Sequence, residues 1–397
     1  MLQELVRAAM AAAPGDVPPP LATPALLPQA KSVKEDPSFP QASPVVPAMT
    51  LPPDLVRRVG DSLLSTNDID CYIHFRAVCP GWRAATDDPM RDTSDPRFQP
   101  RRWIVLDEDF QSEGKLLLLN TESGRFLHRK LPLLSDHYVV ATTRNGYLVL
   151  ADKSPPHSAS VLNPLTGVVI RFMAPVPPEV GYAAVSFANS ALKLTLFADS
   201  SHEIYSAYPD NKSSVVHKVQ QAAYVFFRNA LVGGVYTNTI GLVVIARLCR
   251  LLMTPDANHL CFPVALGREM LLVGSAEVSF FIFKTDKDFK MEDVDTINNY
   301  AIFIGHQRCL AVDADKFLGI EANCIYYTEN LVFSDGGSIC KCDIKDRKVE
   351  KISETADFIK KDKKFVLVAD RPSTIIHLLS SYTINIPDSQ LALQQIP

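Results

Sequence analysis

The chain has 397 residues, of which 47% are apolar and 21% are charged, and its formal net charge is −4 at pH 7. This length exceeds that of most single domains, so we expect two folded units together with disordered ends. The slightly acidic balance argues against a dedicated nucleic-acid binder, which would present a basic face. Eight scattered cysteines with no CxxC pair and no Cys/His cluster predict neither a disulfide framework nor a zinc site. Their thiols fit a reducing compartment.

The first fifty residues are rich in proline. The opening MLQELVRAAMAAAPG is too short and too charged for a secretory signal peptide, which leaves a short tail or, as the alternative, a weak organellar presequence. Ten prolines from Pro14 to Pro47 remove backbone donors and fix φ, so residues 1–50 are predicted to form a disordered, polyproline-rich arm. The most apolar later stretch, Gly241–Met253, contains two arginines and is too short to span a bilayer. We therefore expect a soluble intracellular protein, cytoplasmic and/or nuclear, without a membrane partner.

The segment from Leu51 to Pro89 has the apolar spacing of helices. Pro52 and Pro53 suit a first helical turn, where the missing donors would be unpaired anyway. Apolar residues at i, i+4 and i+8 then predict an amphipathic helix. Residues 65–67 are expected to end this helix and to cap a second one, and a proline at position 80 can open a third. Three helices of this size cannot bury all their apolar groups among themselves, so a surplus apolar face is expected to meet a partner.

The same segment resembles the F-box. The resemblance rests on LPxDL at Leu51–Leu55, on a Leu-Leu pair, on Asp-Ile, and on FRxVCxxWR at Phe75–Arg83, where Pro80-Gly81 replaces a more usual polar pair. It implies a three-helix unit over residues 51–95 that binds a Skp-type adaptor and, through it, a cullin. It also implies eight adaptor-facing residues, which are Leu51, Pro52, Leu55, Val59, Leu63, Val78, Cys79 and Trp82. The alternative is a helical hairpin whose apolar stripe packs on the rest of the chain.

From about Arg101 onward, short apolar runs alternate with turn residues, which predicts strands. The clearest runs are Trp103–Leu106, Lys115–Leu119, Tyr147–Leu150, Val168–Phe172, Leu192–Phe197, Val278–Phe283 and Lys364–Val368. One turn pattern recurs at Leu118–Gly124 and Val161–Gly167, with its asparagines 43 residues apart (163 − 120). Weaker copies are Ser206–Lys212, Ile282–Asp288 and Cys340–Asp346. Each copy predicts a tight hairpin in which Asn, Asp or Gly supplies the turn conformation.

A strand repeat of roughly 40–50 residues is typical of a β-propeller. The fold class is therefore mainly β with a small α domain: an N-terminal three-helix F-box over residues 51–95, followed by a propeller of roughly six blades over residues 96–390. Cys340 and Cys342 are expected to pack on one strand face as small side chains rather than to bind a metal.

The β region is similar to a plant F-box family with a KIB-type propeller of unknown function. The resemblance is carried by Arg97–Leu106, Ala301–Gly305, Asn323–Thr328 and Ile339–Asp343, of which Asn-Cys-Ile-Tyr-Tyr-Thr is the most specific. It implies a plant source and a propeller that recruits a target protein. From the residues themselves, Asn323 is predicted to form a turn, and Tyr326 and Tyr327 to be one core and one surface residue.

The sequence contains no nucleotide-binding loop, HExxH or GxSxG motif, and the acidic run Lys284–Asp295 lacks the Gly and Glu spacing of an EF-hand. It therefore predicts no catalytic residue, cofactor or metal site. The leading hypothesis is the non-catalytic substrate receptor of a Skp–cullin–F-box ubiquitin ligase. One alternative is a binding scaffold outside any ligase, and another is a propeller enzyme or lectin targeted by its F-box.

Overall fold

The computed structural model describes residues 51–106, 115–143, 145–177, 179–188, 191–198, 201–218, 260–266, 269–276, 279–285, 291–305, 308–329, 336–353, 358–361, 364–367 and 374–385. Contacts divide the chain into two compact units, with the division between Asp88 and Pro89. The predicted arm over residues 1–50 and the apolar stretch Gly241–Met253 lie outside the described residues. Within the described parts of the chain, no helix is long and apolar enough to cross a membrane.

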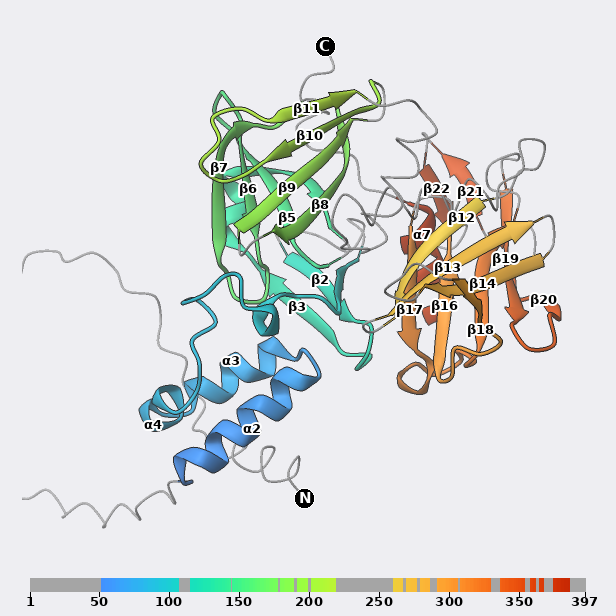
Figure 1. The fold of residues 1–397 in the computed structure, drawn as a ribbon, viewed down its shortest axis with the longest axis horizontal. Helices are drawn as coiled ribbons and strands as arrows, with labels where there is room; N and C mark the ends of the chain where they lie inside the picture. The colour runs from blue at the N-terminus through green and yellow to red at the C-terminus, as the bar shows by residue number, and fades with distance from the viewer. Residues whose placement is uncertain are drawn as a thin grey trace, which may run out of the picture. The chain divides into compact units, whose positions relative to one another are not determined.

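The first unit consists of the three predicted helices (Figure 1), which are α2 (Pro53–Ser65), α3 (Ile69–Ala77) and α4 (Pro80–Ala84). Prolines occupy the first turns of α2 and α4, where no backbone donor is missed. The predicted cap of α3 was wrong. Asp68, not residues 65–67, caps this helix, because its carboxylate accepts a hydrogen bond from the Cys71 backbone N–H at 3.2 Å. Asn67 instead makes the turn, with a left-handed φ of 55°.

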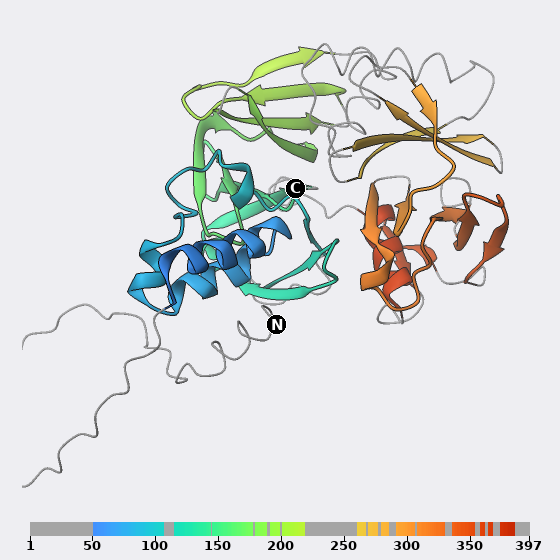
Figure 2. The ribbon, with the colours of Figure 1, turned by 60° about the horizontal axis from the view of Figure 1, so that its bottom comes forward.

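The second unit is mainly β, and its described strands form five twisted sheets (Figure 2). The first has the order β1 (Trp103–Val105), β2 (Lys115–Asn120), β3 (Phe126–Lys130). The second has the order β4 (His137–Thr142), β5 (Leu148–Asp152), β6 (Ser158–Leu162), β7 (Val169–Pro175). The third contains β8 (Val180–Ala188), β9 (Ala191–Ala198), β10 (Glu203–Ala207) and β11 (Val215–Lys218). The fourth contains β12 (Leu260–Leu266), β13 (Glu269–Ala276), β14 (Ser279–Thr285) and β15 (Met291–Asp293).

The fifth sheet is larger and mixed. Its strands are β16 (Tyr300–Ile304), β17 (Cys309–Asp313), β18 (Cys324–Glu329), β19 (Gly336–Asp343), β20 (Val349–Lys351), β21 (Phe358–Lys361) and β22 (Lys364–Leu367). Strands β16 and β18 run parallel, whereas the other pairs of this sheet are antiparallel. Short 3-10 turns occur at η1 (Pro96–Phe98), η3 (Pro132–Ser135) and η4 (Ala314–Lys316), and the described chain ends with helix α7 (Ile375–Ile384).

The expectation of roughly six blades is corrected to five sheets in the described residues. Each of the five hairpin copies seen in the sequence joins two strands of a different sheet, namely β2–β3, β6–β7, β10–β11, β14–β15 and β19–β20. The number of hairpin copies in the sequence therefore predicted the number of sheets better than the length of the region did. Dividing the length of the β region by the length of one repeat overestimated the number of blades, because the fifth sheet alone contains seven strands.

Three of these hairpins share one turn chemistry. The side-chain oxygen of Asn120 accepts the backbone N–H groups two and three residues ahead, both at 3.0 Å. The side chains of Asn163 and Asp343 accept the corresponding pair of N–H groups. In each case the fourth residue after the acceptor has a positive φ: 69° at Gly124, 76° at Gly167 and 53° at Arg347. Glycine adopts this conformation without a steric penalty, which explains the pattern seen in the sequence.

Three buried clusters join the sheets of the second unit. One links β4–β7 with β8–β10, and another links β12–β14 with β16–β18. In the third cluster, Ile104 and Leu119 of the first sheet share a core with Phe303 and Val312 of the fifth sheet and with Leu379 of α7. The first and last sheets of the unit are therefore packed together through their side chains, as closure of a propeller requires.

Candidate protein-interaction surface on the helical unit

The core of the helical unit is built from one set of apolar residues on α2 and α3. Val56, Ile69, Tyr72 and Phe75 are almost fully buried. Gly60 lets the two helices approach closely, because a Cβ at this position would lie 3.1 Å from the Tyr72 ring. These residues stabilise the unit itself and are not available to a partner.

A second set of apolar residues points away from this core. Leu51, Leu55 and Val78 are 42%, 44% and 40% exposed. All three belong to the eight residues predicted to face an adaptor. Leu51 precedes α2, Leu55 lies in its first turn, and Val78 follows α3. An exposed apolar group of this kind favours binding to another protein, because covering it removes apolar surface from water.

The other five predicted residues are divided between surface and packing positions. Pro52 is exposed, whereas Val59, Leu63, Cys79 and Trp82 are half-buried. The Trp82 ring packs against the buried Phe75, with ring centroids 4.3 Å apart. Trp82 therefore contributes to the core of the unit as well as to its surface, a double role that the sequence pattern does not reveal.

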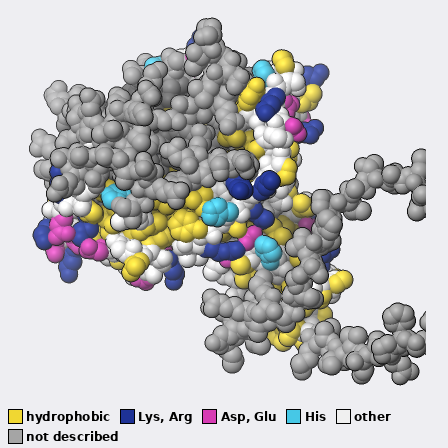
Figure 3. Space-filling model, turned by 180° about the vertical axis from the view of Figure 1, so that it is seen from behind, with side chains coloured by type: hydrophobic (Ala, Val, Ile, Leu, Met, Phe, Trp, Pro, Cys, Tyr) yellow, Lys and Arg dark blue, Asp and Glu magenta, His cyan; other side chains and the backbone are white. Residues whose placement is uncertain are grey.

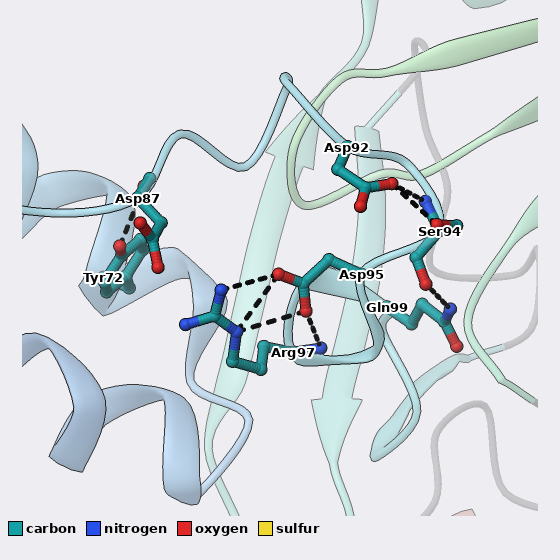
Figure 4. A network of polar contacts seen from close by, with 7 residues as sticks. All are labelled: Tyr72, Asp87, Asp92, Ser94, Asp95, Arg97 and Gln99. Atoms are coloured by element: carbon teal, nitrogen blue, oxygen red, sulfur yellow. Dashed lines mark hydrogen bonds and ion pairs between the residues drawn. The ribbon is translucent and has the colours of Figure 1, made fainter. Parts of the chain in front are cut away.

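Polar contacts fix the segment after α4 on the same unit. The Tyr72 hydroxyl donates a hydrogen bond to the Asp87 backbone carbonyl at 2.8 Å (Figure 4). Arg76 forms an ion pair with Asp88 at 3.4 Å, and its side chain is largely buried. These contacts hold the end of the helical unit against α3.

At the start of the β unit, a separate network orders the chain before the first strand. The Arg97 side chain donates to both carboxylate oxygens of Asp95, to Oδ2 at 2.7 Å and to Oδ1 at 3.2 Å, and the Gln99 amide donates to the Ser94 carbonyl at 3.1 Å (Figure 4). The carbonyl of the buried Phe98 accepts a hydrogen bond from the Asn163 amide at 2.9 Å. Residues 94–99 are thus tied to the β6–β7 hairpin of their own unit.

Tyr326 and Tyr327, predicted to be one core and one surface residue, both make aromatic contacts. Tyr326 is buried and stacks on Phe303, with ring centroids 4.7 Å apart, as predicted for one of the two. Tyr327, the more exposed of the two, is half-buried, and the Phe280 ring packs edge-on against it with ring centroids 4.8 Å apart. Asn323 forms the predicted turn, with a φ of 59°, and its side chain accepts the backbone N–H of Ile297 at 2.9 Å.

Cys340 and Cys342 of the fifth sheet are packed side chains, as predicted. Cys324, Cys340 and Cys342 are buried, and burial raises the pKa of the Cys324 thiol to about 11. Such a thiol stays protonated at neutral pH and is a poor nucleophile. Within the described ranges, no group of three or more His, Cys, Asp or Glu side chains could hold a metal ion.

The sequence did not reveal the ion-pair network on the β19–β20 hairpin. The largely buried Lys341 ammonium lies 2.6 Å from Glu321 and 2.9 Å from Glu350, and Lys348 contacts Glu350 at 2.8 Å. The two lysines, first Lys348 and then Lys341, lower the pKa of Glu350 to about 2. The alternation of charges along Lys341, Lys348 and Glu350 was the available signal, but only the strand register brings them together.

The described side chains on one face of the molecule are mixed in character. On the face drawn in Figure 3, hydrophobic, basic and acidic side chains lie next to one another.

Comparison with known proteins gives one family. The family model described as KIB1-4 beta-propeller matches residues 116–349. This range begins in β2 and ends at the first residue of β20, so it includes at least two strands of every sheet. No curated protein matches the chain significantly.

Proposed function

Since the chain belongs to the KIB1-4 beta-propeller family, we propose that it is the substrate-recognition subunit of a Skp–cullin–F-box ubiquitin ligase. In this proposal the helical unit is an F-box that binds a Skp-type adaptor, and the propeller recruits a target protein. The family supplies the propeller and its compatibility with a protein-interaction surface. The ligase role is supported by the F-box pattern of residues 51–83 and by the surface chemistry of the helices.

The observation that carries the proposal is the division of apolar residues in the helical unit. Val56 and its partners fill the core, whereas Leu51, Leu55 and Val78 remain two-fifths exposed. Exposed apolar side chains at these positions would not stabilise a helical unit that binds no partner. Interfaces are typically anchored by a few such side chains at the centre of the contact.

The proposed role needs no catalytic residue in this chain. Ubiquitin transfer would take place on other subunits, and this protein would hold the target close to the charged ubiquitin carrier. Proximity of this kind raises the effective concentration of the reacting groups. The reaction would take place in the cytoplasm and/or nucleus, and it requires no cofactor from this chain.

Capture of purified partners by the full-length protein tests the proposal. Immobilised chain is expected to retain a purified Skp-type adaptor, and to retain a cullin only when the adaptor is also present. A folded chain that retains neither protein at about 10 μM adaptor would overturn the ligase role. It would favour the alternative of a binding scaffold that acts outside a ligase.

A further inference from the structure

Strand β3 forms an open edge of the first sheet. The sheet has the order β1-β2-β3, and among the described residues no strand pairs with the outer side of β3. The β2–β3 hairpin has the same turn chemistry as the hairpins that end in β7 and β20. Strand β3 therefore occupies the outer position of its sheet, where backbone groups are available to another strand.

The ladder between β2 and β3 decides which residues face this open edge. The backbone N–H of Asn120 donates to the Arg125 carbonyl at 2.9 Å. In an antiparallel pair, hydrogen-bonded and non-bonded positions alternate along each strand. Every second residue after Arg125 is therefore bonded to β2. The residues between these positions, Phe126, His128 and Lys130, direct their backbone N–H and C=O groups to the open edge.

The same three residues also present their side chains to solvent. Phe126 is 44% exposed, and His128 and Lys130 are exposed, whereas the alternate residues are half-buried. Lys115, which pairs with Lys130 across the ladder, is exposed as well. Strands β2 and β3 contain no Asp or Glu, so the exposed side chains of this edge are basic and aromatic.

We propose that the edge of β3 binds an extended acidic segment of a partner protein, which adds to the sheet as a further strand. Main-chain hydrogen bonds to Phe126, His128 and Lys130 would give affinity, as in other strand additions. Carboxylates on the added strand would face Lys130 and His128, and an apolar side chain would face Phe126. The site differs from the helical surface, and it would serve a ligase subunit or a scaffold equally well.

The charge of β3 distinguishes it from three other outer strands, β11, β15 and β20. On β11, Lys218 is paired with Glu203 at 3.1 Å. On β15, Glu292 and Asp293 make the strand acidic, and on β20 Glu350 is held by two lysines. Within the described part of the chain, no ion pair involves Lys115 or Lys130. An acidic segment therefore finds charge complementarity on β3 that β11, β15 and β20 do not offer.

Binding of a defined peptide to the full-length protein tests the proposal. The probe is a fluorescein-labelled peptide in which glutamate alternates with valine, and its control has lysine in place of glutamate. Fluorescence anisotropy is expected to detect binding of the acidic peptide alone. Lys130→Glu should weaken it at least about fivefold, because an attraction becomes a repulsion. Lys351→Glu, the same charge change at an exposed position of β20, should leave binding unchanged.

A second pair of reagents tests the strand geometry. His128→Pro removes an outward N–H while leaving the bonds to β2 intact, which an edge strand tolerates. It should abolish binding without lowering the melting temperature strongly. An acidic peptide with N-methyl groups on alternate amides, offered to the unchanged protein, should also fail to bind in one of its two methylation registers.

Three results of the peptide-binding experiments would overturn the proposal. The first is equal binding of the acidic and basic peptides. The second is binding that survives both Lys130→Glu and N-methylation in either register, which would place the peptide elsewhere. The third is no binding at about 1 mM acidic peptide. If sedimentation instead shows a dimer that His128→Pro dissociates, the edge pairs with a second copy of the chain and not with an acidic partner.

Discussion

Truncating the exposed apolar side chains of the helical unit should separate adaptor binding from folding. The triple variant Leu51→Ala/Leu55→Ala/Val78→Ala removes the three side chains that are 42%, 44% and 40% exposed. Each contributes less to the folded unit than a core residue does, because two-fifths of its surface already meets water. The triple variant is therefore expected to lose mainly adaptor affinity rather than stability of the helical unit.

The size of the loss follows from the remaining exposed area. Fully burying an aliphatic side chain stabilises by about 1.5–3 kcal/mol, so covering the exposed two-fifths contributes about 0.6–1.2 kcal/mol for each residue. Three such residues give about 2–4 kcal/mol in total. Since about 1.4 kcal/mol corresponds to a tenfold change, the triple variant should bind at least about twentyfold more weakly.

Calorimetric titration of a purified Skp-type adaptor into the full-length chain measures this change, and thermal melting checks the fold. Val56→Ala is the matched control, because Val56 is the neighbour of Leu55 in α2 but is 1% exposed. It should destabilise the helical unit by about 1–3 kcal/mol. Trp82 is unsuitable for this comparison, since its truncation removes a contact with Phe75. A triple variant with normal melting and normal adaptor affinity would refute the assigned surface.

Three further predictions concern the β unit. Gly124→Ala should destabilise it by at least about 1 kcal/mol more than Gly167→Ala in denaturant titrations, because both have positive φ but only the first would place its Cβ 2.7 Å from a backbone carbonyl of η4. Gly305→Ala should lower the melting temperature and detach α7, because the new Cβ would lie 2.4 Å from a backbone carbonyl oxygen of this helix. Gly274→Ala is the control, because a Cβ at this position fits without a clash. As the pH falls from 4.5, the ordinary pKa of a glutamate, toward about 2, the lowered pKa of Glu350, this side chain gains a proton and loses its ion pairs with the lysines. The free energy of unfolding should therefore decrease over this pH range. Glu350→Gln should flatten that part of the pH profile, and an unchanged slope would contradict the role of Glu350.

The sequence predicted the elements of the β unit better than their number. Short apolar runs gave strands at every position where they were quoted, because β-branched and aromatic runs bounded by turn residues have few other stable conformations. The Asn120 and Asn163 turns were also predictable, since their side chains bond the local backbone. The count failed because the parallel pair β16–β18 and the extra strands of the fifth sheet depend on contacts between residues far apart in sequence.

The candidate surface was predictable only as a set of residues. The apolar stripe of α2 contains Leu55 and Val56 side by side, and helical spacing alone does not tell which of them faces inward. The packing of Tyr72 against Gly60 fixes the helix pair, with Val56 buried and Leu55 exposed. Trp82 shows the same limit, because a motif tryptophan that looked like a pure contact residue also packs on Phe75.

The two proposed binding surfaces lie in different compact units, which makes their roles separable by experiment. Leu55 belongs to the helical unit and Lys130 to the edge of the first sheet. Changes at sites without shared partners usually add. A chain carrying Leu55→Ala together with Lys130→Glu should therefore show the adaptor defect of the first variant and the peptide defect of the second, each at its own size. If adaptor binding changed the affinity for the acidic peptide, the two units would be coupled. The affinity for an acidic partner would then differ between the adaptor-bound chain and the free chain.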